Sequence, residues 1–388
     1  MADQKWRMPA GMDEWLPPAA WRLEQIRRRV LDVFHSWGYE YIEPPVVEYL
    51  DALLVGAGDD LDLQTLKVVD QRSGRLLGVR ADMTPQAVRV DAHSRPCEGV
   101  QRLCYAGNLV FANPASSVDP RSQLKAGAEL FGSSSLTADA EVVALMIEVL
   151  TAAEVRAPVV VLGHMAIYHS LVGELGLDER SGQSLFAAVQ SKAESDIRQL
   201  VPPGPIADCL VRLPTLMGAQ EVIEQARECL ASVGGAAVAA LDQLAELAAL
   251  VRVRCPEVTV RFDLAELAGY GYHNGPVFSA YHADLGQALA RGGRYDGIGG
   301  EFGRSRPATG FDVSLKALVT DAQPVSGIWA PWAVEAQRKS LDATVRHLRN
   351  SGEAVVTAIT AADQPPGFCT RQLTLDAGDW VIVDLSSG

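Results

Sequence analysis

The chain has 388 residues, of which 48% are hydrophobic and 21% charged, a balance typical of a globular protein with a sizeable buried core. Its formal net charge of −14 disfavours a general nucleic-acid binder, because an acidic surface repels phosphate backbones. The sequence has no signal-peptide core, no stretch of roughly 18 apolar residues and no C-x-x-C pair, so we expect a cytoplasmic protein without membrane contact, structural zinc or redox pair.

The first part of the chain reads as one helix followed by strand pairs. Apolar residues from Leu23 to Trp37 recur at helical spacing, and Gly38 supplies a natural stop. Asp139 is predicted to cap a second helix. The predicted strands are 38–45, 66–70, 76–80, 102–111, 123–131 and 158–163.

The later part changes character twice. Residues from about 165 to 254 are mainly helical, which predicts a helical insertion. Strand signals then return, and a glycine-dense stretch runs from Arg291 to Gly300. A linker at 324–327 precedes a tail with one predicted helix and two predicted strands. The later predicted elements are strands 258–264 and 277–283, helix 334–348, and strands 354–359 and 380–385.

These elements predict an α+β fold with two domains. Hairpins with few intervening helices favour an antiparallel sheet flanked by helices. We expect a core domain over 1–323, which includes the insertion, and a small α/β domain over 328–388. His164 and His169 lie close in sequence without a carboxylate at ligand spacing, so no metal site is expected.

Four short signatures follow one another in an informative order. They are Gly38-Tyr39 to Pro44-Pro45, Arg80 to Thr84, Tyr105 to Gly107 with Gly127 to Gly132, and Gly292 to Asp296 with Gly310-Phe311. One such run is weak evidence, but four at matching separations are specific. Residues 9 to about 320 thus resemble the core of histidyl-tRNA synthetases. The resemblance implies a class II aminoacyl-tRNA synthetase-like sheet and a dimer built on the first signature.

The resemblance also shows where an ATP site has been lost. Activation of an amino acid builds negative charge on the α-phosphate, so the site must supply fixed cations. Phe111, Ala268 and Ala317 stand where the synthetases carry arginines, and Asn113 replaces a glutamate. Losing one transition-state donor costs roughly 3 kcal/mol, or about 10²–10³ in rate. The three changes together predict a protein without catalytic residues or a cofactor.

Two alternatives stay open at this stage. Lys125 or Arg121 could substitute for a missing arginine. The chain could then be an adenylate-forming paralogue of histidyl-tRNA synthetase that acts on an acceptor other than tRNA. Histidine-dependent pyrophosphate exchange would separate that enzyme from a regulatory protein.

The tail is too short and too acidic for a tRNA-reading domain. From Ser326 onward, 63 residues hold five Lys or Arg and seven Asp or Glu, a net charge of 5 − 7 = −2. A phosphate-binding surface would carry the opposite sign. A synthetase core without that domain and without activating arginines resembles the regulatory subunits of ATP phosphoribosyltransferase. The run from Leu16-Pro17-Pro18 to Glu48-Tyr49-Leu50-Asp51 is especially similar.

This second resemblance implies a partner and a form of regulation. The partner is the short-form catalytic subunit of ATP phosphoribosyltransferase, which acts in the first step of histidine biosynthesis. The implied assembly is a hetero-octamer with four subunits of each kind. Assembly activates the complex and histidine inhibits it. The resemblance implies no nucleic-acid partner and no membrane.

The synthetase pocket for histidine is partly kept. The resemblance places an effector site at Asp82, Thr84, Glu129, Tyr272 and His273. His273 replaces a tyrosine of the family, and Lys125 replaces a glutamine that contacts the ammonium group, which a cation would repel. Two interpretations remain. Either these residues bind histidine or a related effector, or they form a buried hydrogen-bonded core in which Lys125 neutralises Glu129.

Overall fold

The fold is seen in a computed structural model that describes residues 6–55, 59–113, 120–231, 233–267, 272–282, 287–320 and 326–385. The chain divides into two units. The first comprises Met1–Glu14 and Leu23–Leu318, and the second comprises Trp15–Arg22 and Val319–Gly388. No helix among the described residues is long and apolar enough to cross a membrane.

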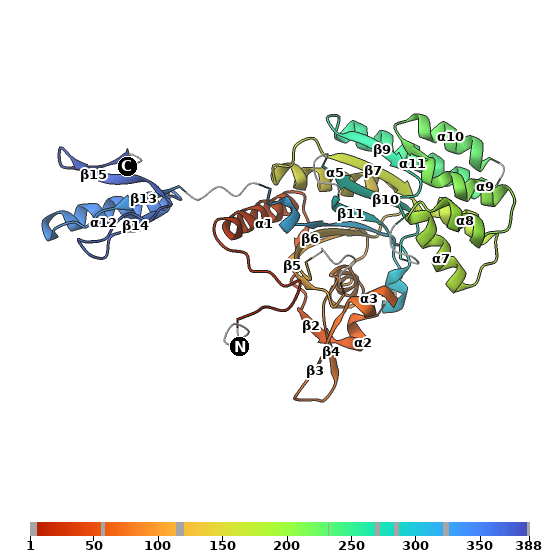
Figure 1. The fold of residues 1–388 in the computed structure, drawn as a ribbon, viewed down its shortest axis with the longest axis horizontal. Helices are drawn as coiled ribbons and strands as arrows, with labels where there is room; N and C mark the ends of the chain where they lie inside the picture. The colour runs from red at the N-terminus through yellow and green to blue at the C-terminus, as the bar shows by residue number, and fades with distance from the viewer. Residues whose placement is uncertain are drawn as a thin grey trace. The chain divides into compact units, whose positions relative to one another are not determined.

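A nine-stranded sheet forms the centre of the first unit (Figure 1). Neighbouring strands are antiparallel, with two exceptions. Counted across the sheet, the first and second strands are parallel, and so are the seventh and eighth. This mainly antiparallel sheet with flanking helices confirms the predicted α+β class. In spatial order the strands are β1 (Glu40–Tyr41), β5 (Gln101–Val110), β6 (Ser122–Phe131), β12 (Ala308–Ser314), β11 (Ala288–Arg294), β10 (Pro276–Tyr281), β7 (Val159–His164), β9 (Thr259–Asp263) and β8 (Met217–Gly218).

The two faces of this sheet differ because side chains alternate along each strand. Phe311 on β12 points toward helix α1 (Ala19–Ser36), where its ring lies 6.1 Å from that of Phe34. Helices α5 (Leu136–Ala152) and α11 (Gly235–Arg254) also pack against the sheet. Gly310, one residue before Phe311, therefore belongs to the opposite face, and this second face carries the candidate site.

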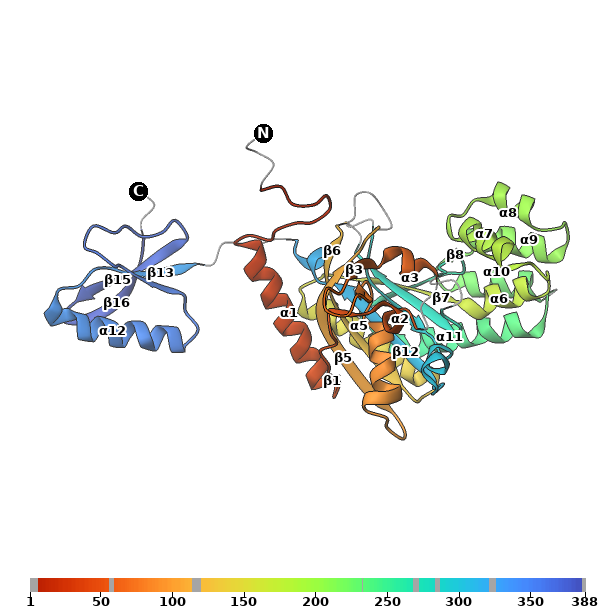
Figure 2. The ribbon, with the colours of Figure 1, turned by 90° about the horizontal axis from the view of Figure 1, so that it is seen from below.

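A group of helices lies between β7 and β9, in the stretch for which a helical insertion is predicted. They gather beside the β7, β9 and β8 end of the sheet in both ribbon views (Figures 1 and 2). Their spacing of buried leucine, isoleucine and alanine residues gives each helix one apolar face, which packs on its neighbours. Before α11 they are α6 (Met165–Gly173), α7 (Glu179–Gln190), α8 (Glu194–Leu200), α9 (Pro205–Arg212), the 3₁₀ turn η3 (Leu213–Thr215) and α10 (Glu221–Leu230).

A small sheet and several short helices complete the first unit. The sheet has the order β2 (Val47–Tyr49), β4 (Leu76–Val79) and β3 (Leu66–Val69), all antiparallel. The predicted hairpin of 66–70 and 76–80 is thus confirmed. The short helices are α2 (Leu50–Leu53), α3 (Asp59–Gln64), α4 (Thr84–Arg89), η2 (Val90–Ser94), η4 (Ile298–Phe302) and η5 (Lys316–Leu318).

The second unit is a four-stranded sheet with one long helix. The sheet order is β14 (Val355–Thr357), β13 (Gly327–Ala330), β15 (Cys369–Asp376) and β16 (Asp379–Asp384), and the helix is α12 (Glu335–Asn350). The prediction of only two strands in this tail was wrong. β13 begins inside the predicted linker. Most residues of β15 are polar, so its sequence lacks a clear alternation of apolar and polar residues.

One predicted helix cap was also wrong. Ser135 caps α5, since its hydroxyl accepts a hydrogen bond from the amide of Thr137 at 3.1 Å. Asp139 lies inside the helix, where its carboxylate accepts hydrogen bonds from Arg294. A buried charge partner more than 150 residues away overrides the local tendency of aspartate to cap.

Candidate functional site

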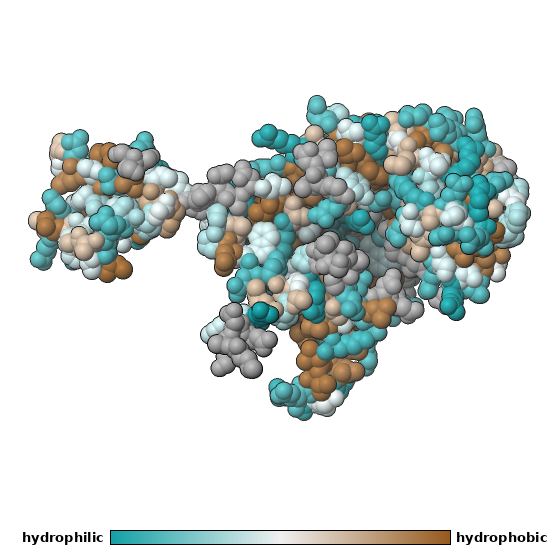
Figure 3. Space-filling view, in the orientation of Figure 1, coloured by the Kyte–Doolittle hydropathy of each residue, from teal (hydrophilic) through white to brown (hydrophobic). Residues whose placement is uncertain are grey.

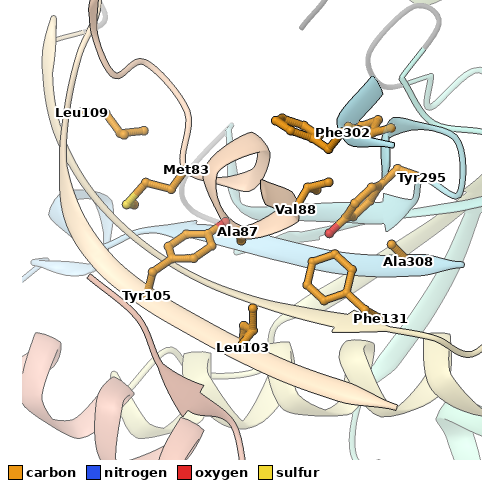
Figure 4. Close-up of a cluster of buried hydrophobic side chains, with 11 residues drawn as sticks. Met83, Ala87, Val88, Leu103, Tyr105, Leu109, Phe131, Tyr295, Phe302 and Ala308 are labelled. Atoms are coloured by element: carbon orange, nitrogen blue, oxygen red, sulfur yellow. The ribbon is translucent and has the colours of Figure 1, made fainter. Parts of the chain in front are cut away.

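Glu129 is the centre of the candidate site. It points from β6 into the second face of the large sheet, and the residue is 1% exposed. Tyr105 on β5 donates a hydrogen bond to its Oε1 at 2.8 Å, and Tyr295 donates one to its Oε2 at 2.5 Å. Figure 4 shows the two tyrosine hydroxyl groups directed toward one another across the cluster. Thr84 extends this network through a 3.2 Å hydrogen bond with Tyr105.

Two glycines make room for this network. A Cβ on Gly310 would collide with the carboxylate of Glu129, its register partner on β6. A Cβ on Gly127 would collide with the ring of Tyr105, its register partner on β5. Any larger residue would therefore displace the side chains at the centre of the site, which explains why these sheet positions are glycine.

The electrostatics of the site are acidic. Burial raises the pKa of Glu129 to about 8, although the two tyrosine hydroxyls and Thr84 act in the opposite direction. Burial also raises the pKa of Asp82, whose carboxylate accepts a hydrogen bond from the amide of Thr84 at 3.0 Å. Lys125 forms an ion pair with Asp312 at 2.8 Å. Lys125 is therefore committed to Asp312 and is not the partner of Glu129.

Three carboxyl groups share this region with two cations, Lys125 and Arg291, the latter opposite Asp312 in the β11–β12 register. Burial raises the pKa of the nearby Tyr105, and the charges of Glu129, Asp82 and Asp312 raise it further, so their fields overlap at this hydroxyl. The carboxyl groups of Asp82 and Glu129 favour a ligand that can donate N–H groups.

Tyr272 and His273 border the cluster in different ways. The ring of Tyr272 lies 5.4 Å from that of Tyr295, so it packs on the polar centre. Nδ1 of His273 lies 3.2 Å from the carbonyl oxygen of Arg294, and burial lowers the pKa of His273 to about 4. His273 is thus a neutral ring anchored to β11. Asp82, Thr84, Glu129 and Tyr272 thus lie in one group, whereas His273 lies at its border.

The positions that replace the ATP-site residues carry no cation. Phe111 packs against the apolar cluster around Leu103 and Tyr105. The amide of Asn113 donates to the carbonyl oxygen of Leu63 at 3.0 Å. Ala317 lies in η5. Ala268 lies outside the described residues.

Arg121 and Arg80, two basic residues near these positions, are held by backbone carbonyl groups. Nε of Arg121 donates to the carbonyl oxygen of Phe111 at 2.8 Å, and its Nη1 reaches the carbonyl oxygen of Ala10 at 3.4 Å. The buried Arg80 donates to the carbonyl oxygens of Asn108 and Pro44 at 2.9 and 2.7 Å. With Lys125 bound to Asp312, the substitution of a missing arginine by Lys125 or Arg121 gains no support from these contacts.

Sequence reasoning missed Tyr105 and Tyr295 as members of the site. Both residues lay inside recognised signatures, but neither was assigned a contact with Glu129. The hairpin register could have found Tyr105, because Leu103 pairs with Glu129 and Tyr105 lies two residues further on the same face. No local signal points to Tyr295, which directly follows β11 and reaches Glu129 across β12.

Glu129 should make stability fall as pH rises. Its folded pKa of about 8 exceeds the ordinary 4.5, so the folded protein keeps a proton that the unfolded chain releases between these values. This stabilising contribution is complete below about pH 4.5 and is lost as pH rises through about 8. We expect Glu129→Gln, which cannot titrate, to be more stable relative to wild type at about pH 8 than at about pH 5.

Urea unfolding of both proteins at the two pH values measures this difference. Glu266→Gln is the matched control, because Glu266 also accepts hydrogen bonds from a serine and a tyrosine, Ser279 and Tyr281, outside this cluster. Identical pH profiles for wild type and Glu129→Gln would refute the elevated pKa.

Comparison with known proteins first defines the class of fold. A family model described as "Histidyl-tRNA synthetase" matches residues 11–318. The crystal structure of histidyl-tRNA synthetase from Nostoc sp. PCC 7120 has a TM-score of 0.80, covers 98% of this chain and 97% of its own, and is 16% identical, which shows the fold alone. The chain thus has the class II fold of histidyl-tRNA synthetases, as its signatures predicted.

More similar relatives define the family within this class. The ATP phosphoribosyltransferase regulatory subunits of Pseudomonas paraeruginosa and Azotobacter vinelandii are 46% and 45% identical to this chain, over 99% and 98% of both lengths. A family model described as "ATP phosphoribosyltransferase subunit HisZ C-terminal domain" matches residues 325–383. A crystal structure titled ATP phosphoribosyltransferase regulatory subunit/histidyl-tRNA synthetase, from Bacillus halodurans, is 28% identical with a TM-score of 0.81 and covers 93% of this chain and 95% of its own. The chain belongs to the family of ATP phosphoribosyltransferase regulatory subunits.

Proposed function

We propose that the chain is a non-catalytic subunit that works in the cytoplasm, activates the short-form catalytic subunit of ATP phosphoribosyltransferase, and makes it sensitive to histidine. Four subunits of each kind form the assembly. The observation that carries the non-catalytic role is the acidic site around Glu129, whose lysine is paired with Asp312. In the described part of this site, Phe111 and Ala317 supply no cation at two positions where the synthetases carry an activating arginine, and catalysis of adenylation would require one.

The same site supports histidine as the effector. The imidazole of histidine presents N–H donors, and its ammonium group is cationic, so both ends match buried carboxyl groups. Glu129 faces the imidazole in this proposal, while Asp82 and Thr84 face the ammonium group. Tyr272 supplies an aromatic wall beside them, and His273 lies next to it as a neutral ring.

Self-association fits an apolar surface on the small sheet of the first unit. Figure 3 shows hydrophobic side chains gathered over β2, β4 and β3. Tyr49 and Val47 lie just beyond the first signature, so a second copy that covers this sheet would use the region the resemblance assigns to the dimer. The exposed apolar residues there are Val47, Tyr49, Val68, Val69 and Leu76.

The decisive test mixes this chain with a short-form catalytic subunit. We expect the mixture to form a complex of four subunits of each kind and to gain ATP phosphoribosyltransferase activity by at least about tenfold, with inhibition by histidine. Sedimentation measures the complex and a spectrophotometric assay measures the activity. The chain alone should show no histidine-dependent pyrophosphate exchange. Exchange by the pure chain, or no activation on mixing, would overturn the proposal.

A further inference from the structure

A hollow in the second unit has features that the regulatory role does not yet explain. It has a volume of about 550 Å³ and lies between α12 and the segments that follow β13 and β14. Figure 1 shows α12 lying along the four-stranded sheet of this unit. Arg338, Arg346 and Arg349 of α12 line the hollow together with Trp332 and Asp342. We call this set of five residues the α12 basic pocket.

Basic residues of the second unit are concentrated in this pocket. The segment from Ser326 onward has five basic and seven acidic residues, and the pocket takes three of the basic ones with only one acidic residue. Elsewhere in the unit, Arg371 is paired with Glu353 at 2.7 Å. In the part of the unit that the structure describes, Arg338 and Arg346 form no ion pair, and both are exposed. A positive surface on a chain of net charge −14 thus keeps its charge free for a ligand.

Aromatic and aliphatic side chains accompany these cations. The guanidinium of Arg338 lies 4.7 Å from the ring centroid of Trp332, which is 44% exposed. Val334 and Ile359, each next in sequence to a residue of the pocket lining, are 61% and 82% exposed. Arginine and tryptophan are the residues most enriched at the energetic centres of protein interfaces. A site for a free phosphate would not need exposed apolar neighbours, so this mixture favours a protein ligand.

We propose that the α12 basic pocket docks a carboxylate-bearing segment of the catalytic subunit that also carries an apolar side chain. This inference rests on the proposed function, which supplies the partner. Arg338 and Arg346 bind the carboxylates, because guanidinium groups match them with two parallel hydrogen bonds. Trp332 packs on the apolar side chain. Arg349 has a mainly structural part, since its guanidinium donates to the carbonyl oxygen of Val355 at 2.8 Å.

The test compares two charge reversals on one helix. Arg346→Glu changes a residue of the pocket, whereas Lys339→Glu makes the same change of charge at an exposed position of α12 outside the pocket lining. Each full-length variant is titrated with the short-form catalytic subunit at low and high salt. We expect Arg346→Glu to bind at least about tenfold more weakly and to lose part of the salt dependence, and Lys339→Glu to stay within about twofold of wild type. Circular dichroism checks that both variants fold.

The outcomes separate this inference from the function on which it rests. Wild type that activates the catalytic subunit establishes the function independently of the variants. Equal binding by wild type and both variants would then overturn the docking role of the pocket. Wild type is also tested for binding of tripolyphosphate, tRNA and anionic lipid vesicles. If Arg346→Glu loses such binding while its assembly with the catalytic subunit is unchanged, the pocket binds a phosphate ligand and the docking role is overturned. Wild type that fails to bind the catalytic subunit would remove the proposed function itself.

Discussion

Replacing Arg294 by methionine should destabilise the first unit by about 3–5 kcal/mol, the range found when one partner of a buried ion pair is removed. The side chain of Asp139 is 0% exposed and that of Arg294 is 7% exposed. Nη2 and Nε of Arg294 donate to Oδ2 of Asp139 at 2.8 and 3.2 Å. Methionine fills similar space but leaves Asp139 buried without its cation, and no solvent is available to replace it.

The pH dependence of this loss identifies its cause. Burial already raises the pKa of Asp139, and Arg294 opposes that rise. Without Arg294 the pKa rises further, so the folded variant holds a proton that the unfolded chain releases, and its stability falls as pH increases. We expect the difference from wild type to be larger at about pH 8 than at about pH 5.

Two further variants make the test specific. Arg294→Met combined with Asp139→Asn removes both charges and should recover part of the loss. Arg198→Met is the matched control, because Arg198 pairs with Glu194 on the surface of α8, where such pairs contribute about 1 kcal/mol or less. Urea unfolding followed by circular dichroism measures all four proteins. A loss for Arg294→Met no larger than that for Arg198→Met would show that the buried pair does not hold α5 to β11.

Local patterns in the sequence were enough to predict the elements on which the site is built. Predicted strands 102–111 and 123–131 match β5 and β6 within one residue at each end, because alternating side chains and a polar turn define a hairpin. The helical spacing from Leu23 predicted α1 in the same way. Glu129 could be singled out only through its resemblance to a synthetase residue.

The partners of the site residues could not be predicted, because they are set by strand order. Lys125 meets Asp312 only because β12 lies beside β6, although nearly 190 residues separate the two. Tyr295 reaches Glu129 from one strand further away. Spacing in sequence contains no information on these crossovers. The alternative in which Lys125 neutralises Glu129 therefore named the wrong carboxylate.

Replacing Glu129 by glutamine should weaken histidine binding by about 100-fold, if histidine occupies the site as proposed. A carboxylate that loses its charge in a buried site forfeits a charge-assisted hydrogen bond, and removing one member of such a buried pair costs roughly 2–5 kcal/mol. Glutamine keeps the shape of the side chain and can still accept from Tyr105 or Tyr295, so the cluster should remain folded. Calorimetry with histidine on the full chain, alone and with the catalytic subunit, measures the effect.

Proton release gives the prediction a second signature. With a pKa of about 8, Glu129 is largely protonated at neutral pH and must lose its proton to give an imidazole N–H a charge-assisted hydrogen bond. Histidine affinity of the wild type should therefore rise between about pH 6.5 and pH 8.5 relative to that of Glu129→Gln, a comparison that cancels the titration of histidine itself.

The control decides between an effector site and a structural core. Glu266→Gln changes a glutamate that also accepts from a tyrosine, so its histidine affinity should equal that of wild type. Absence of heat from every protein, with and without the catalytic subunit, would mean that Glu129, Tyr105 and Tyr295 satisfy one another as a buried core. The raised pKa would then be only the consequence of burying a carboxyl group where two hydroxyl groups suffice to hold it.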